Sequence, residues 1–232
     1  MCGLRLSLKL GGHILFDEEG RVLKERLRSY GEVLRKLYWM DHEVHVVVGG
    51  GPPARRFIEA ARSMGCSEAM CDEIGIQVSR VNALLLLSVI EDFAYPAIPS
   101  SYAEARLALS SGKMVVCGGF QPGQSTVAVA AVLAELMKAD LLVVATDVDG
   151  VYTEDPKISP KARKLERLSY RELLDLMSRG SAEAGTFKLF DHVAIKVMER
   201  AKIATVVIDG RDPANLLKLV VEGEAIGTRI GP

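Results

Sequence analysis

Three apolar segments that each end in consecutive glycines constrain the fold of this chain more than any other feature. They are Leu4–Leu10 before Gly11 and Gly12, Val44–Val48 before Gly49 to Gly51, and Lys113–Cys117 before Gly118 and Gly119. Leucine alternates with polar residues in the first segment, and the other two are rich in β-branched valine, which is typical of β-strands. Each pattern therefore predicts a strand that stops at a tight glycine turn.

Apolar residues at helical spacing follow these turns. They predict helices at Arg21–Met40, Pro53–Met64, Asp72–Ile90, Ser101–Ser110, Ser125–Met137, Tyr170–Met177 and Asp191–Ala201, and another after Asp212. Further strands are predicted at Leu141–Ala145 and Ala204–Ile208, with Ala225–Ile230 returning as an edge strand. Apolar strands that alternate with helices indicate an α/β fold whose mostly parallel sheet is covered on both faces. We expect a three-layer αβα sandwich.

One domain spanning residues 1–232 is enough to explain the length. The chain has 232 residues, 49% apolar and 25% charged, as in an ordinary globular enzyme. Its net charge of −1 lacks the basic excess that nucleic-acid binding requires, so that partner is disfavoured. The longest clean apolar run, Ala83–Leu87, is too short to cross a bilayer, and Met1–Gly20 lacks the apolar core of a signal peptide. We expect a cytoplasmic protein without a membrane partner.

The cysteines and histidines lack the spacing of a metal site. None of the four cysteines lies in a CxxC pair, and the four histidines are not grouped with them. We therefore expect no dedicated metal cage. Cys66, Cys71 and Cys117 are interpreted as small apolar residues, and His42 and His45 as surface or edge residues.

The three glycine turns predict a phosphate-binding site. In an open parallel sheet, ligands bind beyond the carboxyl ends of the strands, and the turns belong to that one edge. Glycine lets backbone N–H groups approach phosphate oxygens, and each following helix adds the positive end of its dipole. The sequence contains no GxxxxGK[ST] loop, no GxGxxG run that opens a helix, and no GxSxG or HExxH motif. Phosphoryl transfer is the reaction class that these missing motifs leave open, since it depends mostly on positioning and positive charge.

Lys9 is the candidate for that positive charge, because it stands at the end of the first strand beside Gly11 and Gly12. The alternative is that Lys9 is the polar residue of an alternating strand. Arg55 and Arg56 follow the glycine triplet, and one of them is expected to meet phosphates while the other is solvated.

A polar loop, Thr146–Pro156, follows the most apolar strand of the chain, where a nucleotide would be held. Tyr152 is expected to flank a base, and Asp155 either accepts from ribose hydroxyls or initiates the turn at Pro156. The basic stretch Lys157–Arg171 is interpreted as a solvated loop or hairpin, with a mobile lid over an anionic substrate as the alternative.

Several motifs together resemble the amino acid kinase superfamily and, within it, the archaeal uridylate kinases. They are KLGG at Lys9, VVVGGGPPARR at Val46, DEIGIQVSRVNA at Asp72, GGFQPGQST at Gly118, VVATDVDGVYTEDP at Val143 and DHVAIK at Asp191. The VDGVYTxDP-type loop occurs across the superfamily, so it indicates the fold rather than the substrate. The segment Phe120–Thr126 is the one that resembles uridylate kinases in particular.

The resemblance implies the amino acid kinase fold and transfer of the γ-phosphoryl group of ATP to UMP, without a phosphoenzyme. It implies that the amino-terminal half holds UMP and the carboxyl-terminal half ATP, with Mg²⁺ carried by the nucleotide phosphates, feedback by UTP, and a homohexamer. Lys9 and Asp147 would be catalytic. UMP would contact Gly50, Asp72, Phe120, Gln121, Pro122, Gly123, Gln124, Ser125 and Thr126. ATP would contact Lys9, Gly11, Gly12, His13, Gly51, Arg55, Thr146, Tyr152 and Asp155.

Some of these positions have alternative interpretations. Asp72 and Thr126 are also plausible N-caps of the helices that follow them. His13 and Asp147 depart from the residues that relatives often carry, and Asp147 resembles the acid that orients active-site lysines in acetylglutamate kinases. Lys196 matches a family lysine or is a surface residue of a helix. The competing functions are another kinase of the same fold, such as an isopentenyl phosphate kinase, and a nucleotide-binding protein without turnover.

Overall fold

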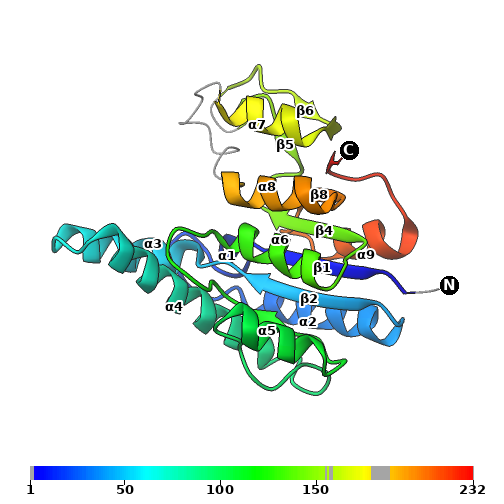
Figure 1. Cartoon of the computed structure of the whole chain (residues 1–232), viewed down its shortest axis with the longest axis horizontal. Helices are drawn as coiled ribbons and strands as arrows, with labels where there is room; N and C mark the ends of the chain where they lie inside the picture. Colours follow the sequence, from blue (N-terminus) through cyan, green and yellow to red (C-terminus); the bar gives the residue numbers. More distant parts are fainter. Residues whose placement is uncertain (1–2, 155, 157–158, 179–188, 232) are drawn as a thin grey trace.

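A mostly parallel sheet lies at the centre of the computed structural model, which describes residues 3–154, 156, 159–178 and 189–231 (Figure 1). Within these residues the sheet has seven strands in the order β3-β2-β1-β4-β8-β9-β7. Their bounds are β1 Arg5–Leu10, β2 Glu43–Val48, β3 Val116–Cys117, β4 Leu141–Thr146, β7 Arg167–Leu168, β8 Thr205–Asp209 and β9 Thr228–Ile230. Strands β1, β2, β3, β4 and β8 are parallel, whereas β9 runs antiparallel to β8. A separate hairpin pairs β5 (Val151–Tyr152) with β6 (Lys164–Leu165).

Helices cover both faces of this sheet, as predicted. They are α1 Gly12–Leu15, α2 Lys24–Trp39, α3 Gly51–Ser63, α4 Glu68–Leu87, α5 Tyr102–Leu109, α6 Thr126–Leu136, α7 Tyr170–Ser178, α8 His192–Ala201 and α9 Ala214–Leu217, which continues as a π-helical turn over Lys218–Glu222. Helices α6 and α8 lie on one face and α2 on the other, while α3 and α4 form a pair that projects beyond the sheet (Figure 1). The three-layer αβα arrangement is therefore confirmed.

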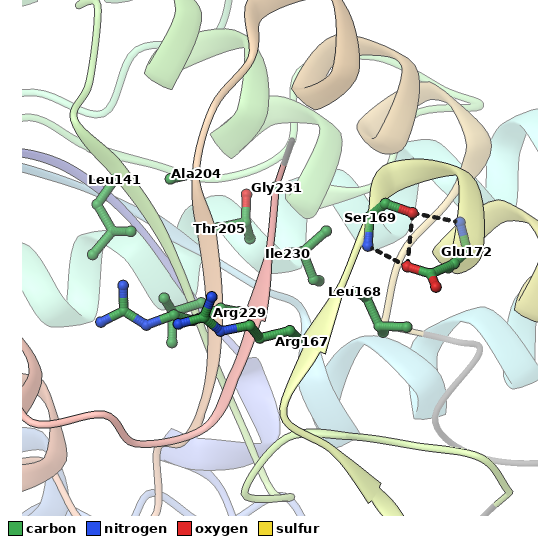
Figure 2. Close-up of a pocket in the computed structure, with 11 residues that line it drawn as sticks. Leu141, Arg167, Leu168, Ser169, Glu172, Ala204, Thr205, Arg229, Ile230 and Gly231 are labelled. Carbon is green, nitrogen blue, oxygen red and sulfur yellow. Dashed lines mark hydrogen bonds between the residues drawn. The ribbon is translucent and has the colours of Figure 1, made fainter.

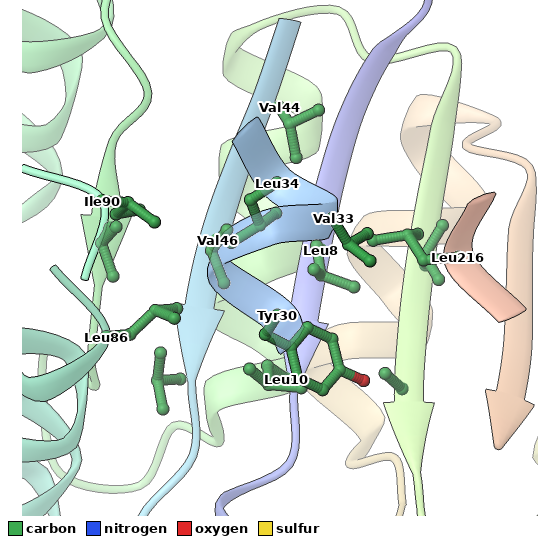
Figure 3. Packing of buried hydrophobic residues seen from close by; sticks show 14 of the residues in the cluster. Leu8, Leu10, Tyr30, Val33, Leu34, Val44, Val46, Leu86, Ile90 and Leu216 are labelled. Carbon is green, nitrogen blue, oxygen red and sulfur yellow. The ribbon is translucent and has the colours of Figure 1, made fainter. Parts of the chain in front are cut away.

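The alternation of residues along the strands explains why two cores form. On one face Leu8, Leu10 and Val46 pack against Tyr30 and Leu34 of α2 (Figure 3). The intervening residues of the same strands and their neighbours, such as Val47 and Val144, pack against α6 and α8. Because both faces are covered, even the polar residues Ser7 and Lys9 of β1 are buried, and Ser7 Oγ donates to Ala130 O at 2.8 Å.

Three details differ from the sequence-based expectations. Strand β9 lies between β8 and β7, so the edge strand is β7 rather than the Ala225–Ile230 segment. Helix α4 begins at Glu68, and its N-cap is Ser67, whose side chain accepts from the Met70 amide. His45 is buried rather than at the surface, because its Nδ1 accepts a hydrogen bond of 2.9 Å from the Val115 amide and ties β2 to the segment before β3.

The basic stretch after β5 contains the predicted hairpin, since β6 returns beside β5. Whether this stretch also acts as a lid stays a prediction. Among the described residues, no helix combines the length and the apolar character that crossing a membrane requires.

Candidate active site

The carboxyl ends of the parallel strands bring the predicted glycine turns together. Gly11, Gly49 and Gly118 each directly follow a strand, and Asp147 and Gly210 follow β4 and β8 at the same edge. The turns are also joined to neighbouring strands: the Gly11 amide donates to Ala145 O at 3.0 Å, and the Gly49 amide donates to Leu10 O at 2.8 Å. The sequence-based expectation that these glycine turns lie at one edge of the sheet is thereby confirmed.

Glycine is required where the first two turns meet. A Cβ atom on Gly12 would overlap the amide nitrogen of Gly51 and lie 2.5 Å from the carbonyl oxygen of Gly49. Gly51 itself has φ +62°, a conformation that side chains disfavour. The backbones of the β1 and β2 turns therefore pack directly on each other, which leaves their amide groups close to any ligand bound there.

Helix α4 holds the glycine turns after β2 and β3 through side chains that the sequence analysis did not single out. Asn82 Nδ2 donates to Gly49 O and to Gly50 O, both at 2.9 Å. Ser79 Oγ accepts from the Gly119 amide at 2.7 Å, and Arg80 donates to Gly119 O at 3.0 Å. Ser79 and Asn82 are buried. The helical spacing of the apolar residues in this segment predicted only that one helix face is buried. The signal that was overlooked is that polar residues also lie on that face.

A small cavity opens between α4 and the loop after β3. It has a volume of about 150 Å³ and is lined by Gly50, Ile58, Asp72, Gly75, Ile76, Ser79, Gly119, Gln121, Gln124 and Thr126. Five of the residues expected to contact UMP thus surround one cavity. Asp72 is not an N-cap, because it lies within α4, and its carboxylate instead accepts from the Gly123 amide at 2.8 Å. This contact closes the loop over the helix.

The remaining residues of that loop form its frame. Phe120 is buried and packs edge-on against Tyr102, with ring centroids 4.6 Å apart. Pro122 is exposed at the tip. Ser125, rather than Thr126, is the N-cap of α6, since its hydroxyl accepts from the Ala128 amide at 3.1 Å.

Gln124 reaches inward beneath the loop, where its Oε1 atom is buried without a hydrogen-bond partner among the described residues. Its amide lies beside the Tyr102 phenol: burial raises the pKa of Tyr102 to about 12, and Gln124 partly offsets that rise. A buried acceptor without a donor carries a desolvation penalty that a bound donor would relieve.

Lys9 is buried at the penultimate position of β1, only 7% exposed. Burial lowers the pKa of its ammonium from 10.5 to about 8, and the nearby Asp147 carboxylate opposes that shift. No described residue forms a hydrogen bond or ion pair with Lys9 that would account for a structural role. A buried cation at the glycine edge is suited to stabilising charge on a phosphoryl group.

His13 and the end of β4 meet next to Lys9. His13 Nε2 lies 3.2 Å from Thr146 Oγ1 and 3.4 Å from Asp147 Oδ1. His13 is the second residue of α1, and its partly exposed ring contacts the end of β4 and the loop that follows it. The structure thus brings four of the predicted site residues, Lys9, His13, Thr146 and Asp147, into one cluster.

Other predicted residues lie farther from this cluster or make different contacts. Tyr152 Oη donates to Asp149 Oδ1 at 2.6 Å, so its hydroxyl holds the loop. Arg55 and Arg56 are both exposed on α3, and Arg56 donates to Glu18 O. Lys196 is exposed and pairs with Glu199 at 3.0 Å, as a surface residue would. Asp155 lies outside the described residues.

Comparisons with known proteins agree with this geometry. A model described as the amino acid kinase family matches residues 5–209. The chain belongs to this family.

Individual relatives of the family are similar over nearly the whole chain. A uridylate kinase from Methanocorpusculum labreanum is 45% identical over 98% of this chain and 95% of its own length. One from Methanosarcina mazei is 46% identical over 95% of this chain and 92% of its own length. The crystal structure of uridylate kinase from Archaeoglobus fulgidus is 42% identical and matches with a TM-score of 0.85. The match covers 98% of this chain and 100% of that chain.

A larger cavity, of about 510 Å³, lies away from the glycine turns (Figure 2). It is lined by residues at the start of β4 and β8 and at the ends of β7 and β9. Arg167 and Arg229, which are register partners in β7 and β9, extend in the same direction there (Figure 2). Because this cavity is at the opposite edge of the sheet from Lys9, it is not the site that the family motifs form.

Proposed function

We propose that this chain is an ATP-dependent UMP kinase that produces UDP. The observation that carries the proposal is a buried lysine at the glycine edge that has no hydrogen-bond or ion-pair partner among the described residues. It is accompanied by a cavity whose lining includes Gln121, Gln124 and Asp72. The 40–46% identity to several archaeal uridylate kinases over nearly their full length supports the same acceptor.

The acceptor site is formed by the amino-terminal half of the chain. Uracil is an uncharged ring with N–H and carbonyl groups, so it needs donors and acceptors rather than an ion pair. The buried Gln124 oxygen can accept from the ring N–H, and Gln121 adds a second amide at the cavity wall. Asp72 accepts from ribose hydroxyls while it holds Gly123. The backbone at Gly50 receives the phosphate.

The donor site is formed by the loops after β1 and β4. Gly11, Gly12 and Gly51 offer close backbone approach, and Thr146 offers a hydroxyl at the end of β4. By family resemblance, Arg55, Tyr152 and Asp155 contact ATP. Mg²⁺ enters bound to the ATP phosphates, where it supplies positive charge.

The reaction is a single in-line displacement. A phosphate oxygen of UMP attacks the γ-phosphorus, the bond from that phosphorus to the bridging β,γ-oxygen breaks, and ADP leaves with the electron pair. Lys9 stabilises the negative charge that shifts between donor and acceptor oxygens. Asp147 raises the pKa of Lys9 and so helps keep the ammonium protonated.

Self-association is a further part of the proposal. Large apolar side chains are exposed on the projecting α3–α4 pair: Phe57, Met64, Met70, Val81 and Leu84. Apolar groups gathered on one projecting pair favour contact with a second copy of the chain. We expect a larger species by light scattering and its loss on Val81→Glu. Hexamer formation and UTP feedback stay predictions from resemblance, and a cytoplasmic location stays a prediction from the sequence.

A coupled assay of ADP release tests the function. The purified chain is given MgATP with UMP, CMP, deoxy-UMP, AMP, isopentenyl phosphate, carbamate or acetylglutamate. We expect a selective UMP signal. Selective turnover of isopentenyl phosphate would favour the other kinase, and ATP binding without any turnover would favour the binding protein.

A further inference from the structure

Asn82 is a buried side chain that holds two successive carbonyl groups of the glycine triplet. It is 3% exposed in the middle of α4, and its single amide nitrogen reaches Gly49 O and Gly50 O at 2.9 Å each. Both amide hydrogens are thereby used on the turn. A polar side chain so placed in an otherwise apolar interface determines how the turn is oriented.

The direction of the carbonyls fixes the direction of the amides. A trans peptide is planar, so the N–H of each unit points opposite to its C=O. When Gly49 O and Gly50 O face α4, the N–H groups of Gly50 and Gly51 face away from α4. In the described part of the chain, neither N–H donates a hydrogen bond. Both donors are therefore directed away from α4.

The dihedral angles agree with an anion cradle. Gly50 is right-handed helical, with φ −72° and ψ −37°, and Gly51 has φ +62°. A right-handed residue followed by a left-handed one curves successive amides around a common centre, which is an anion-binding backbone nest. The next residues, Pro52 and Pro53, have no N–H, so this cradle has only the two donors that Asn82 orients.

We infer that Asn82 is a positioning residue, which selects a phosphorylated acceptor by turning the Gly50 amide toward its phosphate; this rests on the proposed function. Gly50 O also accepts from the Ala54 amide of α3, at 3.4 Å, whereas Gly49 O has only Asn82 as a donor among the described residues. Without Asn82 the Gly49–Gly50 peptide unit is therefore free to turn, and its carbonyl oxygen then faces the phosphate and repels it. Asn215 provides the contrast, because its Nδ2 donates to a carbonyl outside the glycine turns, that of Asp209, at 3.0 Å.

Binding of UMP and of uridine, which lacks only the phosphate, isolates this role. Calorimetry is done on wild type, Asn82→Ala, the isosteric Asn82→Asp and the matched control Asn215→Ala, with folding checked by circular dichroism. We expect Asn82→Ala to reduce the preference for UMP over uridine about tenfold, with uridine affinity changed less than about twofold, since one charge-assisted contact is lost. Asn82→Asp, which cannot donate, reduces the preference further. Asn215→Ala keeps the wild-type preference.

The inference is overturned if folded Asn82 variants keep the wild-type preference, or lose UMP and uridine affinity in equal proportion, as a merely structural residue would. Failure of the proposed function gives a different result, because wild type then fails to prefer UMP. In that case, the acceptor identified by the coupled ADP-release assay and its dephosphorylated alcohol replace UMP and uridine. The same comparison of variants then decides whether Asn82 selects the phosphate.

Discussion

On one side of the sheet edge, buried side chains of α4 hold the glycine turns after β2 and β3; on the other side, exposed charged groups hold the loops after β4 and β8. Asn82 and Ser79 are almost completely buried. In contrast, Lys164 (32% exposed) pairs with Asp149 (53% exposed) at 3.0 Å. Arg211 (55% exposed) pairs with Asp209 (21% exposed) at 2.6 Å.

The two kinds of contact respond differently to a ligand. A buried hydrogen bond is hard to break, because the group left behind loses its partner without gaining water. An exposed ion pair contributes little and is screened by salt. The proposed acceptor side is therefore preformed, whereas the proposed donor side can exchange its internal ion pairs for contacts with a charged nucleotide.

The largest expected effect comes from Lys9, the buried charge that lies between the two sides. We expect Lys9→Met to lower kcat about 10²–10³-fold, as removal of a preorganised charge stabiliser does, with a much smaller change in KM for UMP. Steady-state kinetics checks this. Equal losses in both parameters would show that Lys9 serves binding instead.

The same variant is expected to be more stable than wild type. Lys9 has a folded pKa of about 8 against 10.5 when unfolded, so at neutral pH the unfolded state binds the proton more tightly. The unfolding free energy of wild type therefore increases as pH rises from about 8 to 10.5. At pH 7 the shift corresponds to a penalty of about 3 kcal/mol, which Lys9→Met removes. Urea denaturation at pH 7 and at pH 10.5 checks both points, and the gain should shrink at the higher pH.

Activity should show the opposite pH trend if protonated Lys9 is the working form. We expect kcat/KM for UMP to fall as pH rises through about 8, the pKa of Lys9 in the free protein. A pH profile with saturating MgATP measures this. A flat profile up to pH 10 would show that kcat/KM does not depend on the protonation of Lys9.

Ser79→Ala sharpens the comparison on the acceptor side. It leaves the Gly119 amide without its buried acceptor, so we expect a loss of about 1–3 kcal/mol in unfolding free energy. The matched change on the donor side, Arg211→Ala, removes an exposed ion pair and should change stability by about 0.5 kcal/mol or less. Urea denaturation of both variants compares the two sides directly. Similar losses would break the distinction drawn between them.

The sequence predicted the fold well because its signals are local. Apolar periodicity, glycine turns and the order of elements are enough to place Lys9, Gly11 and Gly49 at one edge. The roles of Asn82 and Ser79 were missed because they depend on which turn a helix face meets, and that is a tertiary contact. The burial of His45 was missed for the same reason, since its partner is Val115, 70 residues away. Ser67 and Asp72 are both plausible N-caps in the sequence, and only the geometry shows that Ser67 caps α4.

Strand β1 has a consequence for the order in which the protein is made. It lies between β2 and β4, so β1 is synthesised long before its second neighbour, Leu141–Thr146. Until β4 is in place, one edge of β1 is unpaired and Lys9 is not enclosed. A nascent chain therefore encloses Lys9 only after β4 has been synthesised, and a ribosome-bound fragment ending before β4 should not retain nucleotide.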